Sequence, residues 1–170
     1  MISMTTLANN TFQLRELKDE VLQDYKKISM LISTIRCDFK CCRDLKTNFC
    51  QNSDLMKQPI YILTYNQLYE RYRKNELTKA IIFGGLEPFL QFDELVGFIR
   101  YMRIEMSCDD DIVIYTGYNE NEIQEQIDIL RQYENIIVKF GRFVPDDTPR
   151  YDDVLGIKLA SSNQYAVHLK

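Results

Sequence analysis

Residues 30–52 have the sequence MLISTIRCDFKCCRDLKTNFCQN, in which a short apolar run leads directly into three spaced cysteines, Cys37, Cys41 and Cys50. An apolar run of this length predicts a buried strand. Thiolates are soft ligands that favour zinc or an iron–sulfur cluster. Three thiolates can hold a four-iron cluster and leave one iron without a protein ligand, so this stretch points to chemistry at the end of a strand.

Two alternatives for the cysteines stay open, namely a zinc site and unligated thiols. Structural zinc normally takes four ligands, and Cys42 or Cys108 could supply the fourth. Adjacent residues such as Cys41 and Cys42 point in different directions in most backbones, so both rarely bind one ion. The chain has five cysteines, and this odd count favours ligands, catalytic groups or buried thiols over disulfides.

Strand and helix patterns alternate around this stretch. Short apolar runs predict strands at residues 28–35, 59–63, 80–85, 111–117 and 135–141. Apolar residues at helical spacing predict helices at residues 65–77, 92–106 and 119–133. We expect residues 145–153 to form a loop and residues 156–169 to form one or two short strands.

This alternation predicts the fold class. Short strands that are buried on both faces imply a parallel sheet with right-handed crossovers. The helices are too few for a closed eight-stranded barrel, so we expect an α/β domain over residues 28–170, built as an open partial (β/α) barrel of mostly parallel strands. Residues 1–27 are polar with weak helical spacing, and we expect them to form an N-terminal extension packed on this domain.

The carboxyl ends of the expected strands should meet at one edge of the sheet, where ligands bind in folds of this kind. The cysteine loop, Gly84-Gly85, Thr116-Gly117 and the loop at Gly141 all follow strands. The glycine pair has a structural explanation as a turn that needs positive φ. It also has a functional explanation, because bare backbone or Glu87 at this point could take a cationic group.

Composition and charge argue against some classes of protein. The net charge of −4 argues against a general nucleic-acid binder, since phosphate contacts need an excess of Lys and Arg. No apolar run reaches the roughly 18–20 residues that span a bilayer, so no membrane association is expected. The first residues lack the pattern of a secretory signal, so a cytoplasmic location is expected.

Four motifs resemble those of the radical S-adenosylmethionine superfamily, and most closely those of the small activating proteins of anaerobic ribonucleotide reductase. The resemblance runs from about Met30 to the C-terminus. The motifs are the cysteine triplet ending in Phe49-Cys50-Gln51-Asn52, the glycine motif Gly84-Gly85-Leu86-Glu87-Pro88, the segment 115–118 and the segment 161–164. Each motif is weak alone, and the comparison depends on their order and spacing.

The chain departs from the family pattern at three places. The usual cysteine spacing is C-x3-C-x2-C, whereas this chain has C-x3-C-x8-C, with Asp44 at the usual third position. Cys50 is assigned as the third ligand because Phe49 matches the apolar residue before the family's third cysteine, and Cys42 remains a possible substitute. Leu86 is inserted in the glycine motif, and the terminal segment is LASSNQ instead of RGSSNQ. These departures suggest a divergent subgroup.

The resemblance implies a ligand set and a reaction. Cys37, Cys41 and Cys50 would bind three irons of a 4Fe-4S cluster, and the fourth iron would chelate S-adenosylmethionine. The other cofactor contacts would come from Gly84, Gly85 and Glu87 at the methionine amino end, Phe39 or Phe49 near the adenine, and Asn163 at a polar edge. One electron from the reduced cluster would cleave the cofactor to a 5′-deoxyadenosyl radical, which abstracts hydrogen from the substrate.

The resemblance also implies partners. Little sequence remains for a separate substrate domain, so we expect a protein substrate, with an anaerobic ribonucleotide reductase or another glycyl-radical protein as the first candidate. A flavodoxin or ferredoxin would supply the electron. The alternative is a non-enzymatic iron–sulfur or zinc module that mediates protein contacts or senses redox state.

Overall fold

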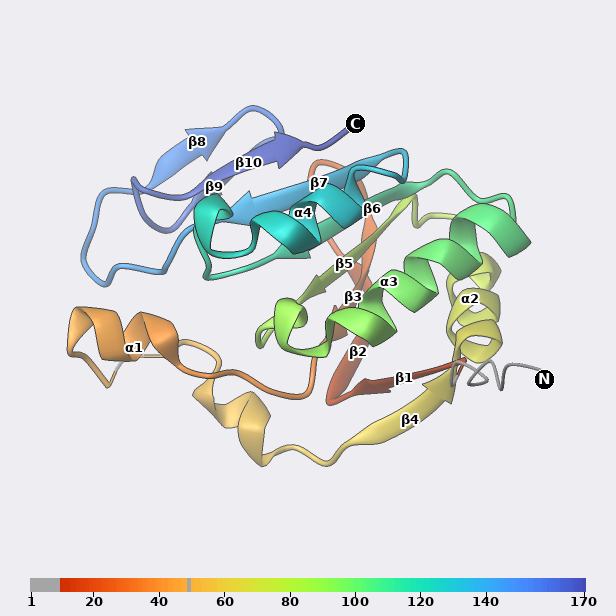
Figure 1. Cartoon of the computed structure of the whole chain (residues 1–170), viewed down its shortest axis with the longest axis horizontal. Helices are drawn as coiled ribbons and strands as arrows, with labels where there is room; N and C mark the ends of the chain where they lie inside the picture. The colour runs from red at the N-terminus through yellow and green to blue at the C-terminus, as the bar shows by residue number, and fades with distance from the viewer. Residues whose placement is uncertain (1–9, 49) are drawn as a thin grey trace, which may run out of the picture.

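The computed structural model describes residues 10–48 and 50–170, and a six-stranded sheet in the order β10-β7-β6-β5-β3-β2 lies at its centre (Figure 1). The middle strands run parallel and are β3 (Ser29–Ser33), β5 (Ala80–Gly84), β6 (Asp111–Tyr115) and β7 (Ile136–Phe140). Antiparallel strands form the two edges, β2 (Glu16–Val21) and β10 (Tyr165–His168). The sheet is therefore mixed, with a parallel centre.

Helices cover one face of this sheet. They are α2 (Tyr65–Lys74), α3 (Phe92–Arg100), which a π-helical turn at Tyr101–Glu105 extends, and α4 (Gln124–Leu130). In Figure 1, α3 and α4 lie in front of the strands. Alternate strand residues such as Ile81 and Ile112 pack against helical residues such as Phe98 and Ile127 in one apolar core.

Placing the helices on a single face is the arrangement of a barrel wall, whereas a doubly wound sheet carries helices on both faces. The opposite face is packed by the segment after β2 and by the hairpin of β8 (Arg150–Asp152) and β9 (Ile157–Leu159). Tyr25 and Leu155 from these segments are buried against Ile82 and its neighbours. Closure of the sheet into a partial barrel stays a prediction.

The remaining elements are short. Strands β1 (Thr11–Leu14) and β4 (Tyr61–Thr64) form a separate antiparallel pair. Helix α1 (Lys40–Leu45) lies in the cysteine loop, and 3₁₀ turns occur at η1 (Ser53–Lys57), η2 (Pro88–Gln91) and η4 (Glu120–Glu122). No helix in the part of the chain that the structure describes is long and apolar enough to cross a membrane.

The strands and helices predicted from residue 28 onward are confirmed, with two differences. The predicted loop at 145–153 contains β8, and the helix predicted at 119–133 begins as the turn η4. The helical spacing assigned to residues 1–27 is wrong for residues 11–21, which form β1 and β2, and residues 1–9 lie outside the described range. The division of the chain after residue 27 stays a prediction.

Candidate functional site

The carboxyl ends of the four parallel strands open into one cavity of about 310 Å³. Its lining includes Gly85 after β5, Thr116 and Gly117 after β6, and Gly141 after β7. The loop after β3 contributes the cysteines. The expected convergence of these loops at one edge of the sheet is therefore confirmed, and it follows from the parallel order of the strands.

Four cysteine side chains line this cavity, Cys37, Cys41, Cys42 and Cys50. All four are partly buried free thiols. Cys37 follows β3, Cys41 and Cys42 lie on α1, and Cys50 precedes η1. The fifth, Cys108, is buried in the apolar core on the helical face, so it does not supply a ligand at the cavity.

Burial is the main effect on the pKa values of the Cys37 and Cys41 thiols. Burial raises the pKa of Cys37 to about 12, and the N–H of Phe39, which donates to its sulfur over 3.3 Å, opposes the rise. Burial also raises the pKa of Cys41. A metal centre bound here would supply the positive charge that stabilises the thiolates, because ligation releases the thiol proton.

The thiols are not gathered around a single point. Among residues 10–48 and 50–170, no three His, Cys, Asp or Glu side chains are arranged to hold one metal ion. A tetrahedral zinc site would therefore require the thiols to move together.

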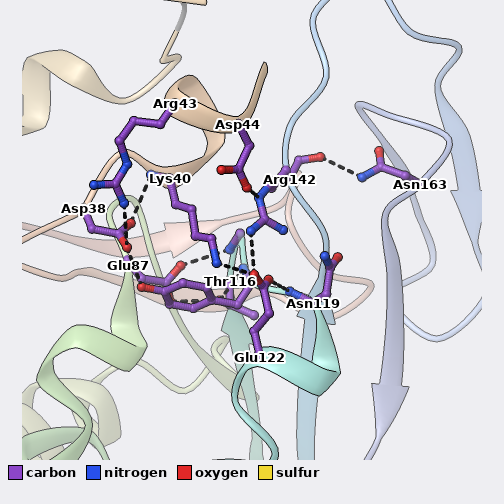
Figure 2. A network of polar contacts seen from close by, with 12 residues as sticks. Asp38, Lys40, Arg43, Asp44, Glu87, Thr116, Asn119, Glu122, Arg142 and Asn163 are labelled. Carbon is purple, nitrogen blue, oxygen red and sulfur yellow. Dashed lines mark hydrogen bonds and ion pairs between the residues drawn. The ribbon is translucent and has the colours of Figure 1, made fainter. Parts of the chain in front are cut away.

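The carboxylate of Glu87 is fixed at the cavity wall. Its side chain is buried, and Oε1 accepts hydrogen bonds from the Phe89 N–H at 3.1 Å and the Thr116 hydroxyl at 2.9 Å. Oε2 accepts one from the Gly117 N–H at 3.0 Å (Figure 2 shows Glu87 beside Thr116). Burial raises the pKa of Glu87 to about 7, and these donors oppose the rise. A carboxylate has about four acceptor positions, so Oε2 keeps one for a ligand.

Lys139 brings a positive charge to the same cavity. Its side chain is buried, and its ammonium donates to the Gly141 carbonyl at 3.1 Å and lies 5.7 Å from the centre of the Tyr115 ring. Burial lowers the pKa of Lys139 to about 8. Within the described residues no carboxylate lies at ion-pair distance from this ammonium. A buried charge without a partner is costly, so an anionic group would be stabilised here.

The structure brings three of the six expected cofactor residues to the cavity. Phe39, Gly85 and Glu87 line it, whereas Gly84 ends β5 and lies outside the lining. Asn163 is exposed, and its amide donates to the Arg142 carbonyl at 3.0 Å. Its role in cofactor binding stays a prediction.

Phe49 and Gln164 remain to be placed relative to the cavity. Phe49 lies outside the described residues. Gln164, which directly follows Asn163, is buried and lines the cavity. No local pattern separates these two neighbouring amides, because both belong to the same polar segment.

Comparison with known proteins identifies the family. The family described as a 4Fe-4S single cluster domain has a model that matches residues 26–166, which is most of the chain. The chain therefore belongs to this family and contains a 4Fe-4S cluster-binding domain. Comparison with curated proteins found no match. The cavity thiols are the residues of this domain whose chemistry fits the cluster.

Proposed function

We propose that this protein is a radical S-adenosylmethionine enzyme whose cluster is held by Cys37, Cys41 and Cys50. The supporting observation is that one cavity holds thiols, a fixed carboxylate and a buried ammonium together. The cluster alone would need only the thiols. The two charges match the amino and carboxylate ends of an amino-acid cofactor, which a non-enzymatic cluster domain has no need to bind.

The chain's own residues would orient and shield the cofactor. When bound, the cluster supplies one electron for the reductive cleavage of S-adenosylmethionine to methionine and a 5′-deoxyadenosyl radical, which takes a hydrogen atom from the substrate. Glu87 would hold the methionine ammonium at the free position of Oε2. Lys139 would hold an anionic group such as the cofactor carboxylate. Phe39 would pack near the adenine.

The substrate that we propose is a protein segment. The cavity is partly open at the carboxyl ends of the strands, so a loop of another protein can enter. Generation of a glycyl radical on an anaerobic ribonucleotide reductase is the first candidate reaction, with a flavodoxin or ferredoxin as the electron donor.

Anaerobic reconstitution tests this function. The reconstituted protein should hold about four irons per chain and release 5′-deoxyadenosine from S-adenosylmethionine when it is reduced. Glu87→Gln keeps the size of the side chain and removes its charge, so it should retain the cluster and lose most of the cofactor affinity. The matched control Glu134→Gln, in an exposed ion pair with Lys170, should behave as the native protein.

The alternative is a non-enzymatic iron–sulfur module. It would be favoured by a full complement of iron and sulfide with no measurable affinity for S-adenosylmethionine and no 5′-deoxyadenosine. Stoichiometric zinc in place of iron, with no release of 5′-deoxyadenosine, would contradict the enzyme and favour a zinc module.

A further inference from the structure

Helix α1 carries Cys41 and Cys42, yet it has almost no apolar anchorage. None of its six residues is buried. Its flanking residues Phe39 and Lys46 both have left-handed backbone conformations, and Phe39 provides no side-chain cap. A helix of this length is not stable alone, so contacts outside α1 must fix its position over the cavity.

Ion pairs connect α1 to the loops that follow β6 and β7, as Figure 2 shows. Lys40 pairs with Glu122 of the turn η4. Asp44 lies four residues further along α1 on the same face, and its Oδ2 is 2.6 Å from Nε of Arg142. Arg142 Nη2 donates to Glu122 Oε1 over 2.8 Å. These four residues, Lys40, Asp44, Glu122 and Arg142, form a chain of ion pairs that we call the α1 clamp.

Arg142 is the buried centre of the α1 clamp. It is 9% exposed, and only 11% of its side chain is exposed, whereas its partner Asp44 has a side chain that is 44% exposed. Its Nε has no aligned hydrogen-bond partner among the described residues, so its contact with Asp44 is an ion pair of charges rather than a directed hydrogen bond. Removing one partner of a buried charge leaves the other without compensation, which is costly.

Glu122 is held firmly in the same arrangement. Its Oε2 accepts the Asn119 N–H at 2.8 Å, and its hydrogen bond with Arg142 is the largest of the effects that lower the pKa of Glu122 to about 2. The clamp therefore stays charged throughout the neutral range. It joins α1 to two loops that already line the cavity.

We propose that Arg142 and Asp44 position the thiol-bearing helix, so that the α1 clamp sets how firmly the chain keeps its cluster. Asp44 occupies the position where the usual cysteine spacing has its third ligand. In this chain it is a positioning residue, and its carboxylate faces Arg142. The proposal rests on the 4Fe-4S cluster of the family and not on cleavage of S-adenosylmethionine.

The rate at which the cluster loses iron tests the role of the α1 clamp directly. The reconstituted native chain, Arg142→Gln, Asp44→Asn and the double variant are transferred anaerobically into an iron chelator, and the iron and sulfide that remain are followed with time. Each single variant should lose iron about tenfold faster, and the double variant should be no faster than the faster single one, because both residues act through one pair. The electron paramagnetic resonance spectrum of the reduced cluster should also change.

The salt dependence separates the clamp from a general loss of stability. High salt should accelerate iron loss from the native chain, because Lys40 and Asp44 are partly exposed, and it should affect Arg142→Gln much less. The control Arg131→Gln breaks exposed ion pairs with Glu120 and Asp128 that do not involve α1, and it should match the native rate.

Two results would overturn the proposal. One is a native rate of iron loss in Asp44→Asn, a variant that changes an exposed side chain and should fold. The other is an additive increase in the rate of iron loss in the double variant. Both outcomes are independent of whether the native protein releases 5′-deoxyadenosine.

Discussion

Glu87 and Lys139 bring opposite charges to one cavity, and burial moves their pKa values toward each other. Burial raises the pKa of Glu87 to about 7, so its carboxylate is ionised mainly above that pH. Burial lowers the pKa of Lys139 to about 8, so its ammonium is present mainly below that pH. Binding of S-adenosylmethionine should therefore be strongest between these values and weaken on both sides, as anaerobic titration calorimetry across pH would show.

Variants show which residue causes the loss of affinity on each side of this pH profile. Glu87→Gln should remove the weakening on the acidic side, and Lys139→Met should remove the weakening on the basic side. Persistence of both limbs in both variants would mean that other groups control binding.

Gly117 tests whether Cys41 binds the cluster. A Cβ at Gly117 would lie 2.7 Å from the Cys41 sulfur, and its backbone does not have the left-handed φ that would exclude alanine. Gly117→Ala should therefore fold but turn the Cys41 side chain away, which lowers the iron content of the reconstituted protein severalfold. Iron analysis and thermal unfolding of the metal-free chain measure the two effects. A native iron content would remove Cys41 from the ligand set.

Cys50 and Cys42 compete for the place of the third ligand, and both line the cavity. Serine has nearly the same size as cysteine but is a poor ligand for iron. We expect Cys50→Ser to lose most of the cluster and Cys42→Ser to keep it, as measured by iron, sulfide and visible absorption. The reverse result would transfer the ligand role to Cys42.

The sequence identifies cavity residues that follow strands more readily than cavity residues that lie within strands. Cys37, Gly85 and Glu87 reach the cavity because each lies just after the end of a parallel strand. Lys139 was missed because it lies inside the apolar run of β7, which predicted only a buried strand. A lone charge in such a run was the available signal. Arg142 was missed because its partners Asp44 and Glu122 are distant in sequence.

Helix α2 depends on a local cap that can be tested separately from the site. The Thr64 hydroxyl accepts the Gln67 N–H at 3.1 Å, and the Gln67 side chain accepts the Thr64 N–H at 2.8 Å. Thr64→Ala should lower the free energy of unfolding by about 1 kcal/mol, because it leaves a helical N–H without its partner. Urea denaturation measures the change. An unchanged free energy would mean that water replaces the cap.

Elements with a buried apolar face were predictable, and those at the edge of the sheet were not. Strands β3, β5, β6 and β7 are buried on both faces, so their apolar runs are clear. β2 has the sequence ELKDEV, in which charges hide the period of two. β1 is a strand because it pairs with β4, about 50 residues away, and no local pattern contains that information.

The core on the helical face stabilises the fold, whereas the cavity at the carboxyl ends of the strands holds the candidate site. Phe98 is fully buried on the helical face, with aromatic neighbours at Phe12, Phe83, Tyr65 and Tyr101. Phe98→Ala should lower the free energy of unfolding by about 3–5 kcal/mol, because it leaves a cavity in a packed core. The paramagnetic spectrum of the cluster in the folded protein should stay the same. A changed spectrum would mean that the core on the helical face is coupled to the cavity.

The charges of β2 have a consequence for the metal-free chain. Among the described strands, β2 forms one border of the sheet, and Glu16, Lys18, Asp19 and Glu20 occupy most of its length. Its register with β3 also shifts between Lys18 and Val21, which bends the border. Charged side chains and an irregular border discourage a second molecule from adding its own strand. We therefore expect this border to disfavour edge-to-edge association of metal-free chains before the cluster is inserted.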